Sequence, residues 1–193
     1  PAGLIPIRHI DGLLAFAAPP TTRSGPVASE DLARIARVLG IGLDDIIESQ
    51  WVDNGPGWVA VLLRSAEAVL ELRPTGGGEH LDIGVVGLYP EGSACAYEIR
   101  AIFTNDRGEG MEDPVTGSLI ASVAQWLVGG GRVTPPYVAS QGTAMGRAGR
   151  PRISQDAEGA IWVGGATRTI VRGTGDVESR RQTVARPRAL ARG

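Results

Sequence analysis

The stretch EDPVTGSLIASVAQWLVGGG, which runs from Glu112 to Gly131, decides the fold. Apolar or small side chains fill nearly every position between a proline and three glycines, and this pattern predicts a helix that is buried almost all round. Pro114 suits the first turn of a helix, where its missing N–H is not needed, and Gly129–Gly131 end the helix. A helix that is apolar on most faces favours strands wrapped around it over a position on an open sheet.

Outward from this helix, the chain alternates short apolar runs with turn residues, a pattern typical of strands. Two strands are predicted between Ile5 and Phe16 around the turn Asp11-Gly12, and two apolar runs flank the tight loop of residues 54–57. LDIGVVGLY and CAYEIRAIF predict two strands that lead into the motif. After the helix, YVASQGTAMG, RPRISQ and AIWVGGATRTIVRG predict a meander of strands.

Two further helices are predicted in the first half of the chain. Ser29 as N-cap, followed by an acidic first turn, begins an amphipathic helix that ends at Gly40. Ser65 caps a short helix that ends near Pro74. The run TGGGEH, residues 75–80, is not followed by the GK[ST] of a phosphate loop, and we interpret it as a flexible connection.

Three absences restrict the chemistry. The chain has no lysine, which excludes Schiff-base catalysis and the P-loop. Cys95 is the only cysteine, so intrachain disulfides, CxxC metal sites and two-thiol racemase chemistry are excluded. His9 and His80 lie far apart and belong to no metal-binding motif. A metal site would have to be all oxygen. We expect no metal and no organic cofactor.

Charge and hydropathy indicate the expected partners and location. The formal net charge of -2 predicts no nucleic-acid and no membrane partner for the chain as a whole. No apolar run is long enough for a membrane span and the first residues lack signal-peptide order, so we expect a cytoplasmic location. Residues 174–193 carry five arginines against two acidic residues, and we expect this tail to be disordered.

The start of the central helix is the candidate site. Burial of the helix directs the free N–H groups of Gly117 and Ser118 toward the interior or a cleft, where a substrate carboxylate would satisfy them. Asp113, just ahead of this partly positive end, either caps the helix or exchanges protons with the bound molecule. The hydroxyl of Ser118 either contacts the substrate or bonds back to the helix.

Three motifs, EDPVTGS before a buried helix, SQGTAMGRAGR at residues 140–150 and IWVGGATRTIVRG, resemble in order and spacing the second half of PhzF-like isomerases of phenazine biosynthesis. The resemblance covers residues 1–173. It implies an α+β fold: a lobe like that of diaminopimelate epimerase, with a curved mixed β-sheet wrapped around a central buried helix. Residues 1–173 would form the C-terminal lobe, and residues 1–20 would include the end of a preceding lobe.

The resemblance also implies roles for single residues. Asp113 corresponds to a proton-handling or orienting aspartate, Ser118 to a substrate-contacting hydroxyl, and Gly117 to a backbone N–H donor. Gln141 and Gly142 match the family's QG motif beside the cleft, where a contact to substrate and a tight bend between strands are equally good interpretations.

The family's principal catalytic glutamate and a glycine-histidine motif belong to a first lobe that this sequence does not contain. Glu112 is the only nearby candidate for that glutamate, and a charge that favours the helix N-terminus is the simpler interpretation. We expect a cofactor-independent isomerase, or its C-terminal half, that acts on a small carboxylate. The alternative is a non-catalytic carboxylate-binding or dimerisation module. The expected partner is a second copy of the chain or a missing N-terminal lobe.

Overall fold

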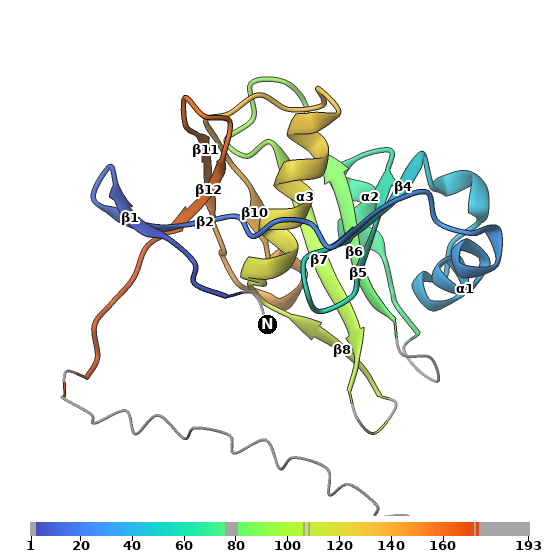
Figure 1. Cartoon of the computed structure of the whole chain (residues 1–193). Coiled ribbons are helices and arrows are strands. Elements are labelled where there is room, and N and C mark those ends of the chain that lie inside the picture. The colour runs from blue at the N-terminus through green and yellow to red at the C-terminus, as the bar shows by residue number, and fades with distance from the viewer. Residues whose placement is uncertain (1–2, 76–80, 106, 108, 172, 174–193) are drawn as a thin grey trace, which may run out of the picture.

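Helix α3, residues Gly117–Gly129, lies between two β-sheets, and its buried side chains form one core with strands of both (Figure 1). The structure is a computed structural model and describes residues 3–75, 81–105, 107, 109–171 and 173. The expected disordered tail and nearly all of the expected glycine-rich connection lie outside these residues.

The other elements follow along the chain as β1 Ile7–Ile10, β2 Leu13–Ala17, β3 Arg23–Gly25, α1 Ser29–Leu39, a 3-10 turn Leu43–Asp45, β4 Glu48–Asp53, β5 Trp58–Leu63, α2 Ala66–Glu71, β6 Asp82–Leu88, β7 Tyr97–Thr104, β8 Gly110–Asp113, β9 Tyr137–Val138, β10 Ser140–Gln141, a 3-10 turn Thr143–Met145, β11 Arg152–Gln155 and β12 Ile161–Gly165. Within these described residues, no helix is long and apolar enough to cross a membrane.

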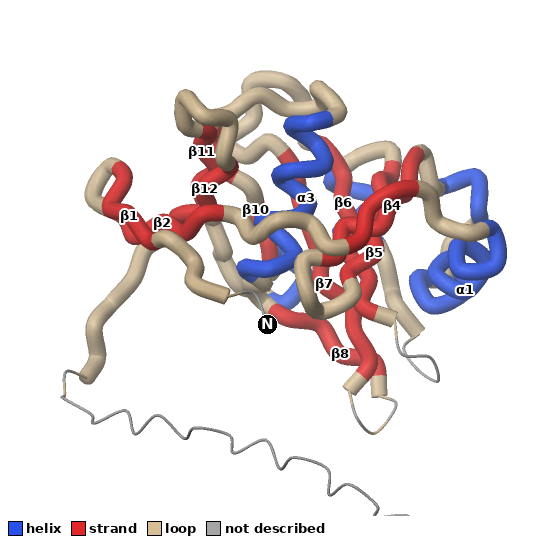
Figure 2. Tube along the Cα trace, viewed as in Figure 1, coloured by secondary structure: helices blue, strands red, loops and turns tan. Residues whose placement is uncertain are grey.

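The larger sheet has the strand order β10-β7-β6-β5-β4-β3, and β8 also pairs with β7. The pairs β5–β6 and β10–β7 are parallel and the others are antiparallel, so this sheet is mixed. The smaller sheet, β1-β2-β12-β11-β9, is antiparallel throughout. Figure 2 shows β1, β2, β11 and β12 on one side of α3 and β4, β5 and β6 on the other. The predicted α+β class with mixed sheet around a central buried helix is confirmed.

Close approach explains how α3 sits on the larger sheet. The side chain of Leu119 lies over Gly84 of β6, where an added Cβ would be 2.5 Å from Leu119 Cδ1. On its other side α3 shares a core with Ile153, Ile161 and Val163 of the smaller sheet. Helices α1 and α2 pack on the opposite face of the larger sheet, around a second core. Each layer therefore buries its apolar face, which is the main stabilising contribution to such a fold.

Several predicted elements are confirmed. The hairpin at Asp11-Gly12 joins β1 and β2, and the loop of residues 54–57 joins antiparallel β4 and β5. Ser65 Oγ accepts a hydrogen bond from the N–H of Ala68 at 3.2 Å and caps α2 as predicted. Gly40 ends α1 as predicted, but Ser29 is its first helical residue rather than its N-cap.

Two predictions about the motif region are wrong. The central helix begins at Gly117, not at Pro114, because residues 110–113 extend as β8 and pair with β7. The three runs after the helix do not form one meander. β10 leaves the smaller sheet and pairs in parallel with β7, which carries Gln141 to the start of α3.

Candidate active site

The first turn of α3 is held from three directions. Gln141 contacts Thr116, the N-cap residue; Trp58 contacts Ser118; and the ring of Phe16 lies against Gly117. These residues come from β10, β5 and β2, so both sheets meet at this end of the helix. The arrangement leaves one predicted carboxylate and one predicted hydroxyl, those of Asp113 and Ser118, half-buried at the same helix start.

Asp113 ends β8, three residues before the N-cap. Its Oδ2 accepts a hydrogen bond from Thr116 Oγ1 at 2.6 Å, and Thr116 itself makes no side-chain cap bond to the helix. Asp113 therefore does not cap the helix backbone directly. In the described part of the chain its Oδ1 has no hydrogen-bond partner, which leaves one oxygen of the carboxylate for a ligand.

Glu112 is committed to an ion pair. Arg100 Nε donates to Glu112 Oε1 at 2.9 Å and Arg100 Nη2 donates to Oε2 at 2.7 Å, a bidentate geometry. The Arg100 Nη1 also donates to the carbonyls of Val69 and Leu72 at the end of α2. The Arg100 side chain is 6% exposed and that of Glu112 is 16% exposed. Glu112 therefore joins β8 to α2 through β7 and is not free to replace the family's catalytic glutamate.

Gln141 is fully buried and its amide is fully used. Its Oε1 accepts from the N–H of Thr116 at 2.9 Å, while Nε2 donates to Asp113 O at 2.8 Å and to Thr116 Oγ1 at 3.0 Å. Gly142 follows in the left-handed conformation, with φ of 84°, and an added Cβ would lie 2.7 Å from Pro114 O. The QG pair thus packs on the chain just before α3 and positions it. A direct contact of either residue with substrate stays a prediction.

Ser118 accepts a hydrogen bond from Trp58 Nε1 at 3.0 Å, and its carbonyl accepts one from Asn54 Nδ2 at 2.9 Å. Its hydroxyl does not bond back to the helix, unlike that of Ser122, whose Oγ donates to Leu119 O at 3.1 Å. Asn54 is 5% exposed, and its Oδ1 has no hydrogen-bond partner in the described residues.

The loop that presents Asn54 and Trp58 is built on Asp53. Its Oδ1 accepts from the N–H groups of Gly55 and Gly57, each at 2.7 Å. Burial by itself raises the pKa of the Asp53 carboxyl. The two backbone hydrogen bonds and one from the Thr22 hydroxyl lower the pKa, and the net shift is downward. The carboxylate is thereby kept ionised, and it fixes the loop beside α3.

A second polar cluster supports Gln141 from behind. Glu98, which is fully buried on β7, accepts from Tyr89 Oη at 2.9 Å and from Thr143 Oγ1 at 3.1 Å, both at Oε2. Ser140 Oγ lies 3.1 Å from Thr143 Oγ1 and accepts from Arg150 Nη1 at 2.8 Å. Burial and the neighbouring Glu98 raise the pKa of Tyr89 to about 12. The cluster holds the chain on both sides of Gln141.

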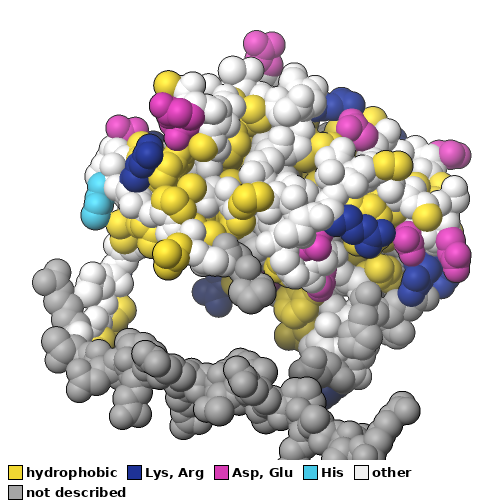
Figure 3. Space-filling view, in the orientation of Figure 1, with side chains coloured by type: hydrophobic (Ala, Val, Ile, Leu, Met, Phe, Trp, Pro, Cys, Tyr) yellow, Lys and Arg dark blue, Asp and Glu magenta, His cyan; other side chains and the backbone are white. Residues whose placement is uncertain are grey.

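An apolar groove of about 500 Å³ adjoins this helix start. Gly117 is the only predicted site residue among those that line it. Figure 3 shows hydrophobic side chains gathered on the face over β1 and β2, where Ile7 is 66% exposed. The apolar side chains of the groove are those of Ile7, Leu14, Ala15, Phe16, Val115, Ile120, Ala148, Pro151, Val163 and Ala166.

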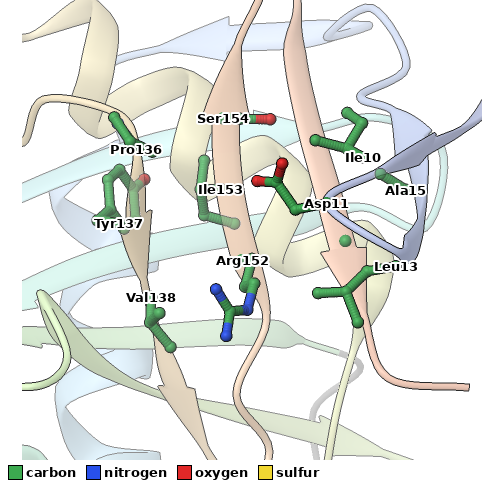
Figure 4. Close-up of a pocket in the computed structure, with 11 residues that line it drawn as sticks. Ile10, Asp11, Leu13, Ala15, Pro136, Tyr137, Val138, Arg152, Ile153 and Ser154 are labelled. Carbon is green, nitrogen blue, oxygen red and sulfur yellow. The ribbon is translucent and has the colours of Figure 1, made fainter.

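A smaller cavity of about 240 Å³ lies between the β1–β2 turn and strands β9 and β11. Figure 4 shows Asp11, Arg152 and Ser154 around it, with Tyr137 and Val138 on one side. It contains none of the predicted site residues. In the described part of the chain, no three His, Cys, Asp or Glu side chains lie where they could hold a metal ion together.

Comparison with known proteins identifies the family. The model of the PhzC-PhzF family, phenazine biosynthesis-like proteins, matches residues 2–178. The chain is a member of the PhzC-PhzF family. The family predicted from the three motifs is therefore confirmed, and the assignment of the chain to the C-terminal lobe stays a prediction. No curated protein shows a significant match to the chain.

Solved structures share the fold, and those from Bacillus anthracis and Enterococcus faecalis carry the description PhzF family. The Bacillus anthracis protein has a TM-score of 0.63 and 15% identity over 83% of this chain and 60% of its own. The Enterococcus faecalis protein has a TM-score of 0.61 and 18% identity over 89% of this chain and 60% of its own. A predicted epimerase from Pseudomonas aeruginosa has a TM-score of 0.58 and 19% identity over 79% of this chain and 55% of its own. The chain thus spans less than two thirds of each of these relatives.

The PhzF-like motifs predicted Asp113 and Ser118 as site residues, but no sequence pattern predicted the contact of Trp58 with Ser118 or that of Arg100 with Glu112. Trp58 lies 60 residues before Ser118 in the chain, and Arg100 belongs to a strand with no motif. The sequence carries one usable signal, the NGPG loop next to Trp58, which predicted a turn but not its contact with the helix.

Proposed function

We propose that this chain forms one wall of the active site of a cofactor-independent isomerase that moves a proton within a small carboxylate-bearing metabolite. One observation carries the proposal. A carboxylate oxygen of Asp113 and the hydroxyl hydrogen of Ser118, both without partners in the described residues, belong to the segment that begins a buried helix. The description of the Pseudomonas aeruginosa relative as a predicted epimerase supports the reaction class.

The chemistry follows from these groups. The free N–H groups at the start of α3 and the hydroxyl of Ser118 would bind the carboxylate of the substrate. Asp113 would take the proton when a C–H bond near that carboxylate breaks, and the electron pair would be delocalised into the adjacent π system. Return of the proton to a different carbon, or to the other face of the same carbon, completes the isomerisation. Gly117, Gln141 and Gly142 would line or position the site.

The alternative is a non-catalytic carboxylate-binding module. The ion pair of Glu112 with Arg100 supports it, because Asp113 is then the single free carboxylate at this helix start. Under this alternative, small carboxylates would bind but no proton would move.

We further propose that the second wall comes from a second copy of the chain. Because the two lobes of family members are similar to each other, two copies of this chain could pair as the two lobes do. The apolar groove beside Gly117 supports this, because the side chains around it, such as Ile7 and Val115, are exposed. Burial of an exposed apolar patch of this kind is typical of association. Sedimentation at micromolar concentration tests the pairing, and a monomeric mass would contradict it.

Asp113→Asn tests the catalytic role. Asparagine keeps an oxygen that accepts from Thr116 but removes the charge and the basicity, so we expect isomerase activity to fall at least about a hundredfold with little loss of stability. The assay follows uptake of solvent deuterium into a panel of small carboxylic acids by mass spectrometry. Binding of these acids without deuterium uptake in the wild type would support the binding module instead. A large loss of stability in Asp113→Asn would show that the role of Asp113 is structural.

A further inference from the structure

The hydrogen bond between Trp58 and Ser118 has a fixed direction. An indole N–H can only donate, so Ser118 Oγ must be the acceptor at 3.0 Å. One lone pair of the hydroxyl is thereby used. The hydroxyl hydrogen remains, and it has no acceptor among the described residues.

Helical serines commonly turn this hydrogen back onto the carbonyl three or four residues earlier. Ser122, one turn further along α3, does so through Leu119 O. Ser118 does not, because it is the second residue of α3, and the residues three and four positions earlier lie before the N-cap Thr116. The position of Ser118 in the first turn leaves its hydroxyl hydrogen free, and the indole of Trp58 fixes the oxygen that carries it.

Asn54 holds the same residue through the backbone. Its Nδ2 donates to Ser118 O at 2.9 Å, and the side chain is 5% exposed with Oδ1 unpartnered in the described part of the chain. A buried acceptor without a partner destabilises a protein by about 1–3 kcal/mol. The stability of the fold therefore does not explain why the amide side chain of Asn54 is buried here. Its hydrogen bond to the backbone of Ser118 does explain it.

We infer that Trp58 and Asn54 are positioning residues that make Ser118 a hydrogen-bond donor to its ligand. The site then selects an acceptor oxygen, such as that of a carboxylate, and discriminates against a donor group of the same shape. The inference rests on the proposed function, since it assigns the polarity of the proposed carboxylate contact. Trp58 itself is 5% exposed and acts through Ser118.

The test measures benzoate affinity of the full chain by NMR titration, with benzamidine as a donor probe of the same shape. Trp58→Phe keeps the ring packing but removes the N–H, and we expect it to weaken benzoate binding by about three- to tenfold. In a Ser118→Ala background the same change should have no further effect, because the indole acts only through the hydroxyl. Wild type should bind benzoate and not benzamidine.

Trp162→Phe is the matched control. Trp162 on strand β12 is also buried, but its indole N–H donates to Asp156 Oδ2 at 2.8 Å and its ring lies under the guanidinium of Arg8, so its N–H does not serve Ser118. It should leave benzoate affinity unchanged. Equal weakening by Trp58→Phe in the wild-type and Ser118→Ala backgrounds, or no weakening at all, would overturn the positioning role while the carboxylate site stands.

Benzoate binding by the wild-type chain and the indole resonance of Trp58 provide two further tests. Absence of benzoate binding by the wild-type chain would overturn the proposed carboxylate site and this inference together. Where Trp58→Phe does not fold, the indole N–H resonance of Trp58 decides, because Ser118→Ala should shift it and speed its exchange with solvent. An unchanged Trp58 resonance in Ser118→Ala would overturn the inference.

Discussion

The Oε1 atom of Gln141 accepts a hydrogen bond from the backbone N–H of Thr116 at 2.9 Å, although Thr116 lies 25 residues earlier in the chain. Gln141 thereby performs part of the role of a helix-capping side chain. Thr116 is the N-cap of α3 but uses its own hydroxyl for Asp113. The amide of Gln141 therefore connects the carboxylate, the N-cap and the following helix. The proposed site depends on a contact between β10 and α3.

Gln141→Ala should destabilise the fold by about 2–3 kcal/mol, because it leaves the N–H of Thr116 and the carbonyl of Asp113 buried without partners. Urea unfolding followed by circular dichroism measures the change. Gln155→Ala is the control, since the Gln155 amide bonds to Gly159 O at an exposed turn. A similar small loss in both variants would contradict the capping role.

Gly142→Ala should destabilise the fold more than Gly146→Ala. Both glycines have positive φ, 84° and 68°, so each substitution carries the same backbone penalty of about 1–2 kcal/mol. Only at Gly142 would the new Cβ collide with Pro114 O, at 2.7 Å, whereas nothing lies within 4 Å at Gly146. The difference between the two unfolding free energies therefore measures the close approach, and equal values would refute it.

Glu112→Gln should lower the unfolding free energy by about 3 kcal/mol, because it leaves the buried guanidinium of Arg100 without its carboxylate. The exposed pair of Arg64 and Asp45 provides the comparison, and Asp45→Asn there should change stability by less than about 1 kcal/mol. Chemical denaturation of the two variants under the same conditions measures both. Nearly equal losses would show that burial adds nothing to the Arg100 pair.

Alkaline pH should destabilise the protein through its tyrosines. The pKa of Tyr89 is raised to about 12 from its ordinary 10.0, by burial and by Glu98, so the folded chain keeps a proton that the unfolded chain loses. The unfolding free energy should be level below pH 10 and fall between pH 10 and about 12. Burial raises the pKa of Tyr97 and Tyr137 in the same direction.

Tyr89→Phe should make that decline shallower, and thermal unfolding across the alkaline range measures it. The absence of lysine simplifies the test, because no side-chain ammonium group titrates in this range. A decline that is unchanged in Tyr89→Phe would show that Tyr89 keeps its ordinary pKa.

The family resemblance implied the class of fold, whereas hydropathy and turn residues predicted most strands and the burial of the central helix. They did so because both are local properties of the chain: an all-round apolar segment must be covered, and Asp11-Gly12 favours a tight hairpin turn. The start of the helix was misplaced at Pro114, since the pairing of β8 with β7 outweighs the helical preference of that proline. No local pattern reports such a pairing.

The sequence by itself determined which chemical groups are present: Asp113 and Ser118 in a family motif, no lysine, and one cysteine. Only the tertiary structure decided which hydrogen-bond and ion-pair partners the groups at the site have. It commits Glu112 to Arg100, turns the oxygen of Ser118 toward Trp58, and places the amide of Gln141 on Thr116. The physical reason is that the direction of a hydrogen bond depends on partners that are distant in the chain and meet only when both sheets pack around α3.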